Sequence, residues 1–181
     1  MWDDSEPVDV PRIDDLLDAL AAREPAPGGG SAAALVGAIA AAVCAKVAGF
    51  GDDGGAIAQA AALCRRLTQL AEEDAHVFAN ALGELDRRDD DFKLGRALDE
   101  AAKAPLRIAD ACVDVAVLAA ALASRGAPEL QPDARAAAAL AAGAARASAV
   151  LVEANLAVAP DDERVQRARK LSEEAAAAAD A

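Results

Sequence analysis

Apolar residues recur every three or four positions along most of the chain, which is the spacing of one face of an α-helix. In the short segment from Ile13 to Ala22, for example, Ile13, Leu16, Leu17 and Leu20 fall on one side. No segment shows the strict apolar–polar alternation of a half-buried strand. The pattern predicts helices over residues 13–22, 31–49, 56 to 83 or 85, 92–124, about 133–157, and from 160 into the alanine-rich tail.

Proline, glycine and charged residues separate these helices. The breaks fall at Pro25 and Pro27, in the loop 50–55, in the charged connection 86–91, and at Gly126 and Pro128. Proline within a helix loses a hydrogen bond and clashes with the preceding turn, so Pro105 should kink the fourth helix or split it near Ala104. We therefore expect a single all-α domain over residues 1–181, with no flexible linker.

Composition indicates how these helices pack. The chain is 55% hydrophobic but only 2% aromatic, and roughly a third of it is alanine. Small residues lie four apart in one set, Ala33, Gly37, Ala41 and Ala45, and in a second set, Ala139, Gly143 and Ala147. Small side chains at this spacing allow helix backbones to approach closely. The prediction is an up-and-down bundle of about five to six helices, with helix faces left over for a second subunit.

Charge and cysteine content exclude several classes of protein. A net charge of −13 without a basic stripe is unfavourable for binding nucleic acid. Cys44, Cys64 and Cys112 are widely spaced and form no metal-ligand pattern, so we expect neither a disulfide framework nor a metal site. The acidic N-terminus is unlike a signal peptide, and the most apolar segment, residues 32–45, is too short to span a membrane. We expect a cytoplasmic protein.

The sequence from Pro25 to Ser31, Pro-Ala-Pro-Gly-Gly-Gly-Ser, stands directly before a long predicted helix. Glycines permit positive φ angles and let a ligand approach the backbone. The free amides and the dipole at a helix N-terminus favour a carboxylate or phosphate. Ser31 could cap the helix or bind a ligand; the alternative is a plain turn capped by Ser31. The motif lacks the Gly-Lys-Ser/Thr of a phosphate-binding loop, and no strand precedes it as in a dinucleotide fingerprint.

The segment PAPGGGSAAALVGAIAAAV resembles the opening of the cyclodeaminase/methenyltetrahydrofolate cyclohydrolase family, which includes the cyclodeaminase half of formiminotransferase-cyclodeaminase. The resemblance continues in order along almost the whole chain. It includes the acidic segment 72–78 with an aspartate and a phenylalanine four apart, the proline segment 104–109, the loop 126–133 that ends in an aspartate, and Asn155-Leu156.

This resemblance implies an all-helical homodimer that acts on reduced folates without a metal or redox cofactor. The reaction would be hydrolysis of 5,10-methenyltetrahydrofolate to the 10-formyl form, or loss of ammonia from 5-formiminotetrahydrofolate. Either requires a group that moves protons. The implied acid/base residues are Asp133 and Asp74, and the implied substrate-binding residues are Pro27, Gly28, Gly29, Gly30, Ser31 and Asn155.

Several residues have structural alternatives. Asp133 could simply cap a helix, and Asp74 could be a solvated surface acid. Asn155 lies 22 positions beyond Asp133, about 33 Å along a helix, so the two could share a site only across a dimer. The segment 49–54 lacks the lysine of the family pattern. A second hypothesis is therefore a non-catalytic or repurposed helical dimer that binds a small anion or a protein partner.

Overall fold

The computed structural model describes residues 13–24, 26–86, 91–157 and 159–181. The helices are α1 (Asp14–Ala21), α2 (Gly29–Phe50), α3 (Gly54–Asp86), α4 (Asp91–Ala101), α5 (Lys103–Arg125), the short 3₁₀ helix η1 (Pro128–Leu130), α6 (Gln131–Asn155) and α7 (Glu163–Ala179). These residues contain no strand. The predicted all-α fold is confirmed, whereas most of the connection predicted at 86–91 lies outside the described residues.

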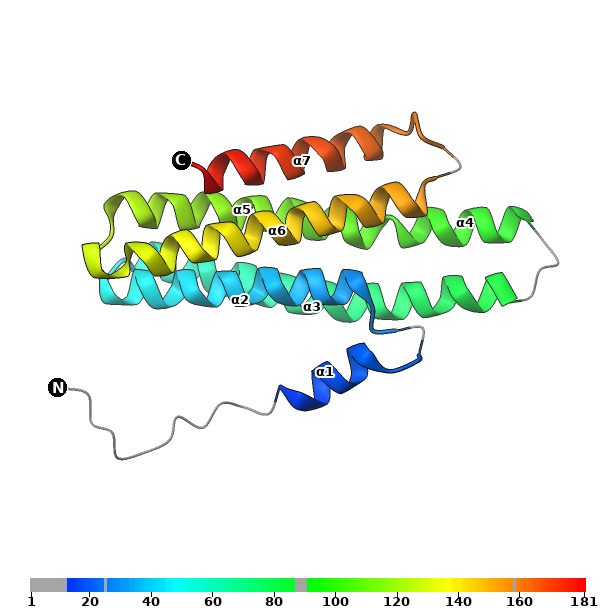
Figure 1. Ribbon diagram of the computed structural model, residues 1–181, viewed down its shortest axis with the longest axis horizontal. Coiled ribbons are helices and arrows are strands. Elements are labelled where there is room, and N and C mark those ends of the chain that lie inside the picture. The colour runs from blue at the N-terminus through cyan, green and yellow to red at the C-terminus, as the bar shows by residue number, and fades with distance from the viewer. Residues whose placement is uncertain (1–12, 25, 87–90, 158) are drawn as a thin grey trace.

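Four long helices, α2, α3, α5 and α6, run side by side along the molecule (Figure 1). Each packs against its neighbours in the bundle, and α7 lies on the outside against α5 and α6. The helix α4 continues the line of α5, and α1 stands away from the bundle (Figure 1). The start of α2 and the end of α6 therefore meet at one end of the bundle.

Small residues on α2 let the core helices pack closely, as the sequence predicts for the set Ala33, Gly37, Ala41 and Ala45. Ala33, Gly37 and Ala41 are buried, and a β-carbon at Gly37 would lie 2.7 Å from the Cys112 sulfur on α5. A side chain there would force α2 and α5 apart. The second set is different, because Ala139, Gly143 and Ala147 are exposed on α6 and make no such contact within the chain.

Several helix ends differ from the predicted ones, among them those next to Pro105 and Asp133. The predicted break at Pro105 occurs, but three residues earlier, because α4 ends at Ala101 and Pro105 lies in the first turn of α5. Proline is tolerated there because first-turn amides have no partner within the helix. At the other end of the bundle, α6 already begins at Gln131, so Asp133 lies in its first turn.

Two stretches, Gly29–Phe50 and Pro128–Asn155, are long and apolar enough to cross a membrane by length and composition alone. The first is longer than the 14-residue apolar segment considered from the sequence. About half of each stretch, 50% and 44% of its most apolar window, is buried inside the bundle. One buried side against other helices is what a core helix of a bundle requires.

Candidate active site

A small cavity of about 40 Å³ lies where the start of α2 meets α3, α5 and α6. It is lined by Gly28, Gly29, Gly30, Asp74, Phe78, Pro105, Leu151 and Asn155. Three groups of residues suggested by the sequence, the glycine loop, Asp74 and Asn155, are therefore brought together from distant parts of the chain. Pro27 lies in the bend just before this cavity and is half-buried.

Gly30 and Asp74 make the closest contact in this cavity. A β-carbon built on Gly30 would lie 2.2 Å from Asp74 Oδ1 and 2.4 Å from Oδ2, so only glycine leaves room for the carboxyl group. Gly29 is less restricted, since the nearest atom to its β-carbon would be a Leu151 methyl at 3.6 Å. The positive φ angles that glycine permits are not used here, because no described glycine has one. Close approach explains Gly30 instead.

Ser31 is not the N-cap that the sequence predicts. The helix begins at Gly29 with Gly28 as N-cap, which has no side chain to satisfy the free amides. Ser31 lies in the first turn, 2% exposed, and its hydroxyl lies 3.0 Å from the Ala71 carbonyl oxygen and 3.3 Å from Asp74 Oδ2. Asp74 also accepts a hydrogen bond from the Ser31 backbone amide. A carboxyl group from α3 thus replaces the missing cap of α2.

Asp74 is a buried acid, 8% exposed, rather than the solvated surface residue considered above. Burial raises its pKa above the usual value of 3.8, while hydrogen bonds from the Ser31 side chain and backbone act in the opposite direction. His76 is exposed, so it forms no pair with Asp74. A buried carboxyl group with a raised pKa, in a cavity, is suited to proton transfer.

Asn155 holds the far wall of the cavity in place. Its side-chain amide nitrogen donates a hydrogen bond to the Ala101 carbonyl oxygen, with 3.0 Å between the two atoms. Ala101 is the last residue of α4, where the chain breaks before α5. Asn155 therefore ties the end of α6 to this break, next to Pro105.

Asp133 lies at the opposite end of the bundle from Asp74. Its carboxylate accepts a hydrogen bond from the Lys46 ammonium group at 3.0 Å, with 44% of the Asp133 side chain exposed. Lys46 is near the end of α2, whereas Gly30 is at its beginning. The distance of about 33 Å between Asp133 and Asn155 applies because α6 is unbroken between them. Within one chain, the two predicted acid/base residues are not brought together.

Three residues of the cavity lining were not singled out by sequence reasoning as site residues: Phe78, Pro105 and Leu151. Phe78 lies four positions after Asp74, one helical turn along α3, so its position could have been predicted once Asp74 was chosen. Leu151 has no distinguishing signal among the many apolar residues of α6. No group of three or more potential metal-ligating side chains occurs in the part of the chain that was described.

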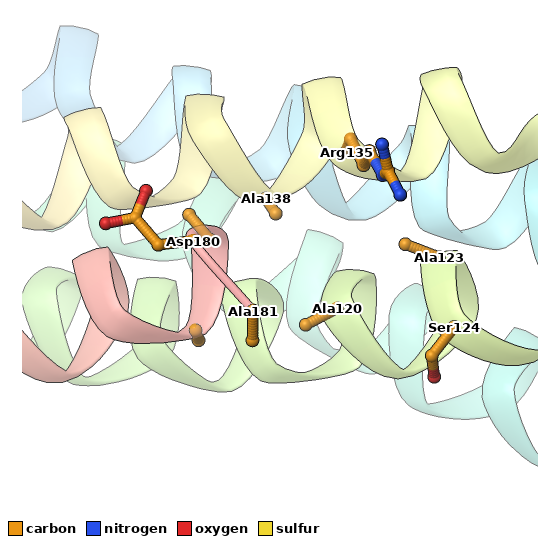
Figure 2. A pocket seen from close by; sticks show the side chains of 9 residues that line it. Ala120, Ala123, Ser124, Arg135, Ala138, Asp180 and Ala181 are labelled. Carbon is orange, nitrogen blue, oxygen red and sulfur yellow. The ribbon is translucent and has the colours of Figure 1, made fainter.

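A larger recess of about 330 Å³ lies away from these residues, between α5, α6 and the end of α7. Figure 2 shows that its sides are mostly alanine, with Arg135 on α6 and Asp180 after α7 as its charged residues. The recess has no buried acid, and its charged groups are of opposite sign. It lacks the features that distinguish the Asp74 cavity.

A family model described as formiminotransferase-cyclodeaminase matches residues 12–174. The chain belongs to the formiminotransferase-cyclodeaminase family. This family member also resembles the crystal structure of formiminotetrahydrofolate cyclodeaminase from Thermotoga maritima, with a TM-score of 0.79 and 26% sequence identity. That similarity covers 91% of this chain and 88% of the other. A search of curated proteins finds no significant match.

Proposed function

We propose that this protein is an enzyme of folate one-carbon metabolism, a methenyltetrahydrofolate cyclohydrolase or a formiminotetrahydrofolate cyclodeaminase. Membership of the formiminotransferase-cyclodeaminase family supports this, as does the similarity to a formiminotetrahydrofolate cyclodeaminase over nine-tenths of the chain. The observation that carries the proposal is the buried carboxyl group of Asp74, held against Gly30 and Ser31 in a cavity at the start of α2.

Both reactions need a group that takes up a proton and returns it. In the cyclohydrolase reaction, water adds to the methenyl carbon and loses a proton, which leaves a hydroxyl adduct. The hydroxyl group then loses its own proton as the formyl carbonyl forms, and the bond from that carbon to one folate nitrogen breaks as this nitrogen gains a proton. One proton is released in all. In the cyclodeaminase reaction, a folate nitrogen attacks the formimino carbon and loses its proton, and the departing nitrogen gains a proton and leaves as ammonia. We assign the proton transfer to Asp74, whose raised pKa lets it act as acid and as base.

The size of the cavity determines what could enter it. A volume of about 40 Å³ accommodates a few water molecules but not a bicyclic pterin. We therefore place the reacting water, or the departing ammonia, inside the cavity beside Asp74. The flat pterin would lie over the opening, against the side chains of Phe78 and Leu151. Without a buried acid beside the cavity, the water or ammonia inside it would have no protein group with which to exchange a proton.

The second hypothesis, a repurposed fold that binds a small anion, has less support. The cavity lining includes a carboxyl group and no basic residue, which is unfavourable for an anion. An assay on both folate substrates separates the hypotheses. We expect the purified protein to accelerate either the decay of methenyltetrahydrofolate absorbance or the formation of that absorbance from the formimino substrate. Failure to accelerate either one would exclude the enzyme proposal in favour of a repurposed fold.

We further propose that the enzyme is a cytoplasmic homodimer formed over the α2–α6 face, which we define as Val36, Ile39 and Val43 on α2 together with Leu140, Gly143 and Val150 on α6. The contacts Lys46–Asp133 and Gly29–Leu151 fix these helices as antiparallel neighbours. In this register Ile39 lies beside Leu140. Ile39, Leu140 and Val150 are 49%, 42% and 59% exposed, which is unusual for large apolar side chains grouped on one face.

Such a dimer offers a role for Asp133. If the two-fold axis runs across the helices, the Asp133 end of one copy faces the Gly29 end of the other. We propose that Asp133 contributes to the site of the partner subunit, where it could assist the proton transfer assigned to Asp74. This arrangement reconciles the role proposed for Asp133 with its separation from Asn155 along α6.

A further inference from the structure

Ser31 is in an unusual position for a buried serine. Its hydroxyl oxygen lies 3.0 Å from the Ala71 carbonyl oxygen and 3.3 Å from Asp74 Oδ2, and both of these belong to another helix. Among the described residues, the other fully buried serine, Ser148, donates instead to Ala144 in its own helix at 2.9 Å, which is the ordinary local arrangement. Ser31 therefore links α2 to α3 at the acid itself.

A serine hydroxyl carries one proton, whereas Ser31 faces two acceptors. The Ala71 carbonyl oxygen always accepts, but the Asp74 carboxyl group needs a donor most strongly when it is ionised, because a buried charge without hydrogen bonds is unfavourable. When Asp74 is protonated, its charge is gone and the hydroxyl is better placed on Ala71, at the shorter of the two distances.

We propose that Ser31 is a positioning residue whose hydroxyl turns from the Ala71 carbonyl to Asp74 when Asp74 loses its proton, and turns back when the proton returns. Rotation about one side-chain bond is sufficient, since both acceptors are already within reach. The Ser31 backbone amide is a second donor to Asp74. The site therefore gains a hydrogen-bond donor only while the carboxylate is charged.

Other charged groups do not provide this donor. The described ion pairs on the neighbouring helices, among them Arg107–Glu73 and Glu153–Arg169, which are both exposed, do not include Asp74. On α3 itself, Glu73 and His76 are exposed, and α2 carries no charged side chain before Lys46. Ser31 is thus the one side chain among the described residues that donates to Asp74.

The catalytic consequence rests on the proposed function, but the motion itself does not. In a proton-transfer step, the same acid must be stable in both charge states within one turnover. A hydroxyl that follows the charge stabilises the ionised state without leaving an unpaired donor in the protonated state. Loss of this hydroxyl should therefore affect the proton-transfer step more than substrate binding.

The test is a pH titration of isotopically labelled protein by carbon NMR, without substrate. In the wild type, we expect the Ala71 carbonyl resonance to titrate with the same midpoint as the Asp74 carboxyl resonance. In Ser31→Ala, the Ala71 resonance should no longer follow Asp74, and the Asp74 midpoint should move to higher pH. Ser148→Ala, which removes a buried hydroxyl that donates within its own helix, should leave both resonances as in the wild type.

An Ala71 resonance that does not follow Asp74 in the wild type would overturn the proposal, because the hydroxyl would then be fixed. An unchanged Asp74 midpoint in folded Ser31→Ala would overturn it as well. Ser31→Cys, which fills the space left by the hydroxyl but donates weakly, gives the same test if the alanine variant fails to fold. Since no substrate is present, these outcomes are independent of whether the protein turns over a folate. If turnover is found, kcat should fall more than KM rises in Ser31→Ala, and Ser31→Thr should recover part of it.

Discussion

The Asp74 carboxyl group lies so close to Gly30 that a β-carbon on Gly30 would come within 2.2 Å of Asp74 Oδ1. The contact joins the first turn of α2 to the middle of α3 and leaves the carboxyl group no room to move toward α2. Glycine is therefore needed at position 30 because a side chain would have no room there, and not because the backbone has a positive φ angle. Asp74 is thus held in place by the first turn of α2, the helix that it caps.

Replacing Gly30 with alanine should displace Asp74 and destabilise the protein. We expect the free energy of unfolding to fall by about 1–3 kcal/mol, as for other overpacked sites. Gly29→Ala is the matched control, because its β-carbon would meet only ordinary contacts at 3.6 Å. Urea unfolding measures the free energy of unfolding of both variants. Equal values for Gly30→Ala and Gly29→Ala would contradict the close contact between Gly30 and Asp74.

The raised pKa of Asp74 predicts a specific pH dependence of stability. The unfolded chain releases this proton near the ordinary value of 3.8, whereas the folded protein holds it to higher pH. The contribution of Asp74 to the free energy of unfolding is therefore fully present below the pKa of this group in the unfolded chain. It is lost as pH rises through the pKa of Asp74 in the folded protein.

Asp74→Asn has no proton to lose, so its stability relative to the wild type should increase as pH rises through this interval, and then level off. Urea unfolding at a series of pH values provides the measurement. If the stability of Asp74→Asn relative to the wild type instead increased as pH falls, the pKa of Asp74 would be lowered in the folded protein.

The proposed dimer depends on the α2–α6 face. Leu140→Glu places a charge in the centre of this face and should shift the protein from dimer to monomer. Val117→Glu is the control, since Val117 is 54% exposed but lies on α5, outside the face. Light scattering coupled to size-exclusion chromatography distinguishes the two masses. A monomeric wild type, or equal effects of the two substitutions, would rule out this interface.

A site shared between subunits can be tested by mixing variants. Asp74→Asn and Asp133→Asn should each lose most of the turnover, while heterodimers contain one intact site. Random re-association of equal amounts should therefore restore about a quarter of the wild-type turnover. Full activity in Asp133→Asn alone would mean that this residue serves only to pair with Lys46 at the start of α6.

The sequence predicted the helices well because their apolar spacing is regular and their breaks contain proline and glycine. It also suggested the glycine loop, Asp74 and Asn155 as site residues, and the fold shows that they meet in one cavity. Three contacts depend on tertiary packing and have no local signal. These are the Gly30–Asp74 approach, the bond from Asn155 to Ala101, and the lining by Leu151.

Ser31 shows why local rules fail at such a site. A serine after three glycines and before a helix has the pattern of an N-cap, and this is what the sequence predicts. The helix instead begins two residues earlier, and the Ser31 hydroxyl lies 3.3 Å from a carboxyl oxygen of Asp74, 43 positions away on another helix. Sequence spacing cannot reveal a partner on another helix. The small-residue set on α6 is a second example, because equal spacing leads to exposure there and to burial on α2.

The most direct test of the account is the turnover of Asp74→Asn on the folate substrate that the wild type accepts. Asparagine keeps an oxygen for the Ser31 amide, so the fold should be retained, as circular dichroism can verify. We expect kcat to fall by roughly 10²–10⁴-fold, the usual contribution of a general acid/base group. Glu73→Gln, an exposed neighbour, should keep turnover near the wild-type level. Wild-type turnover in Asp74→Asn would contradict the central claim and leave Asp74 as the cap of α2 alone.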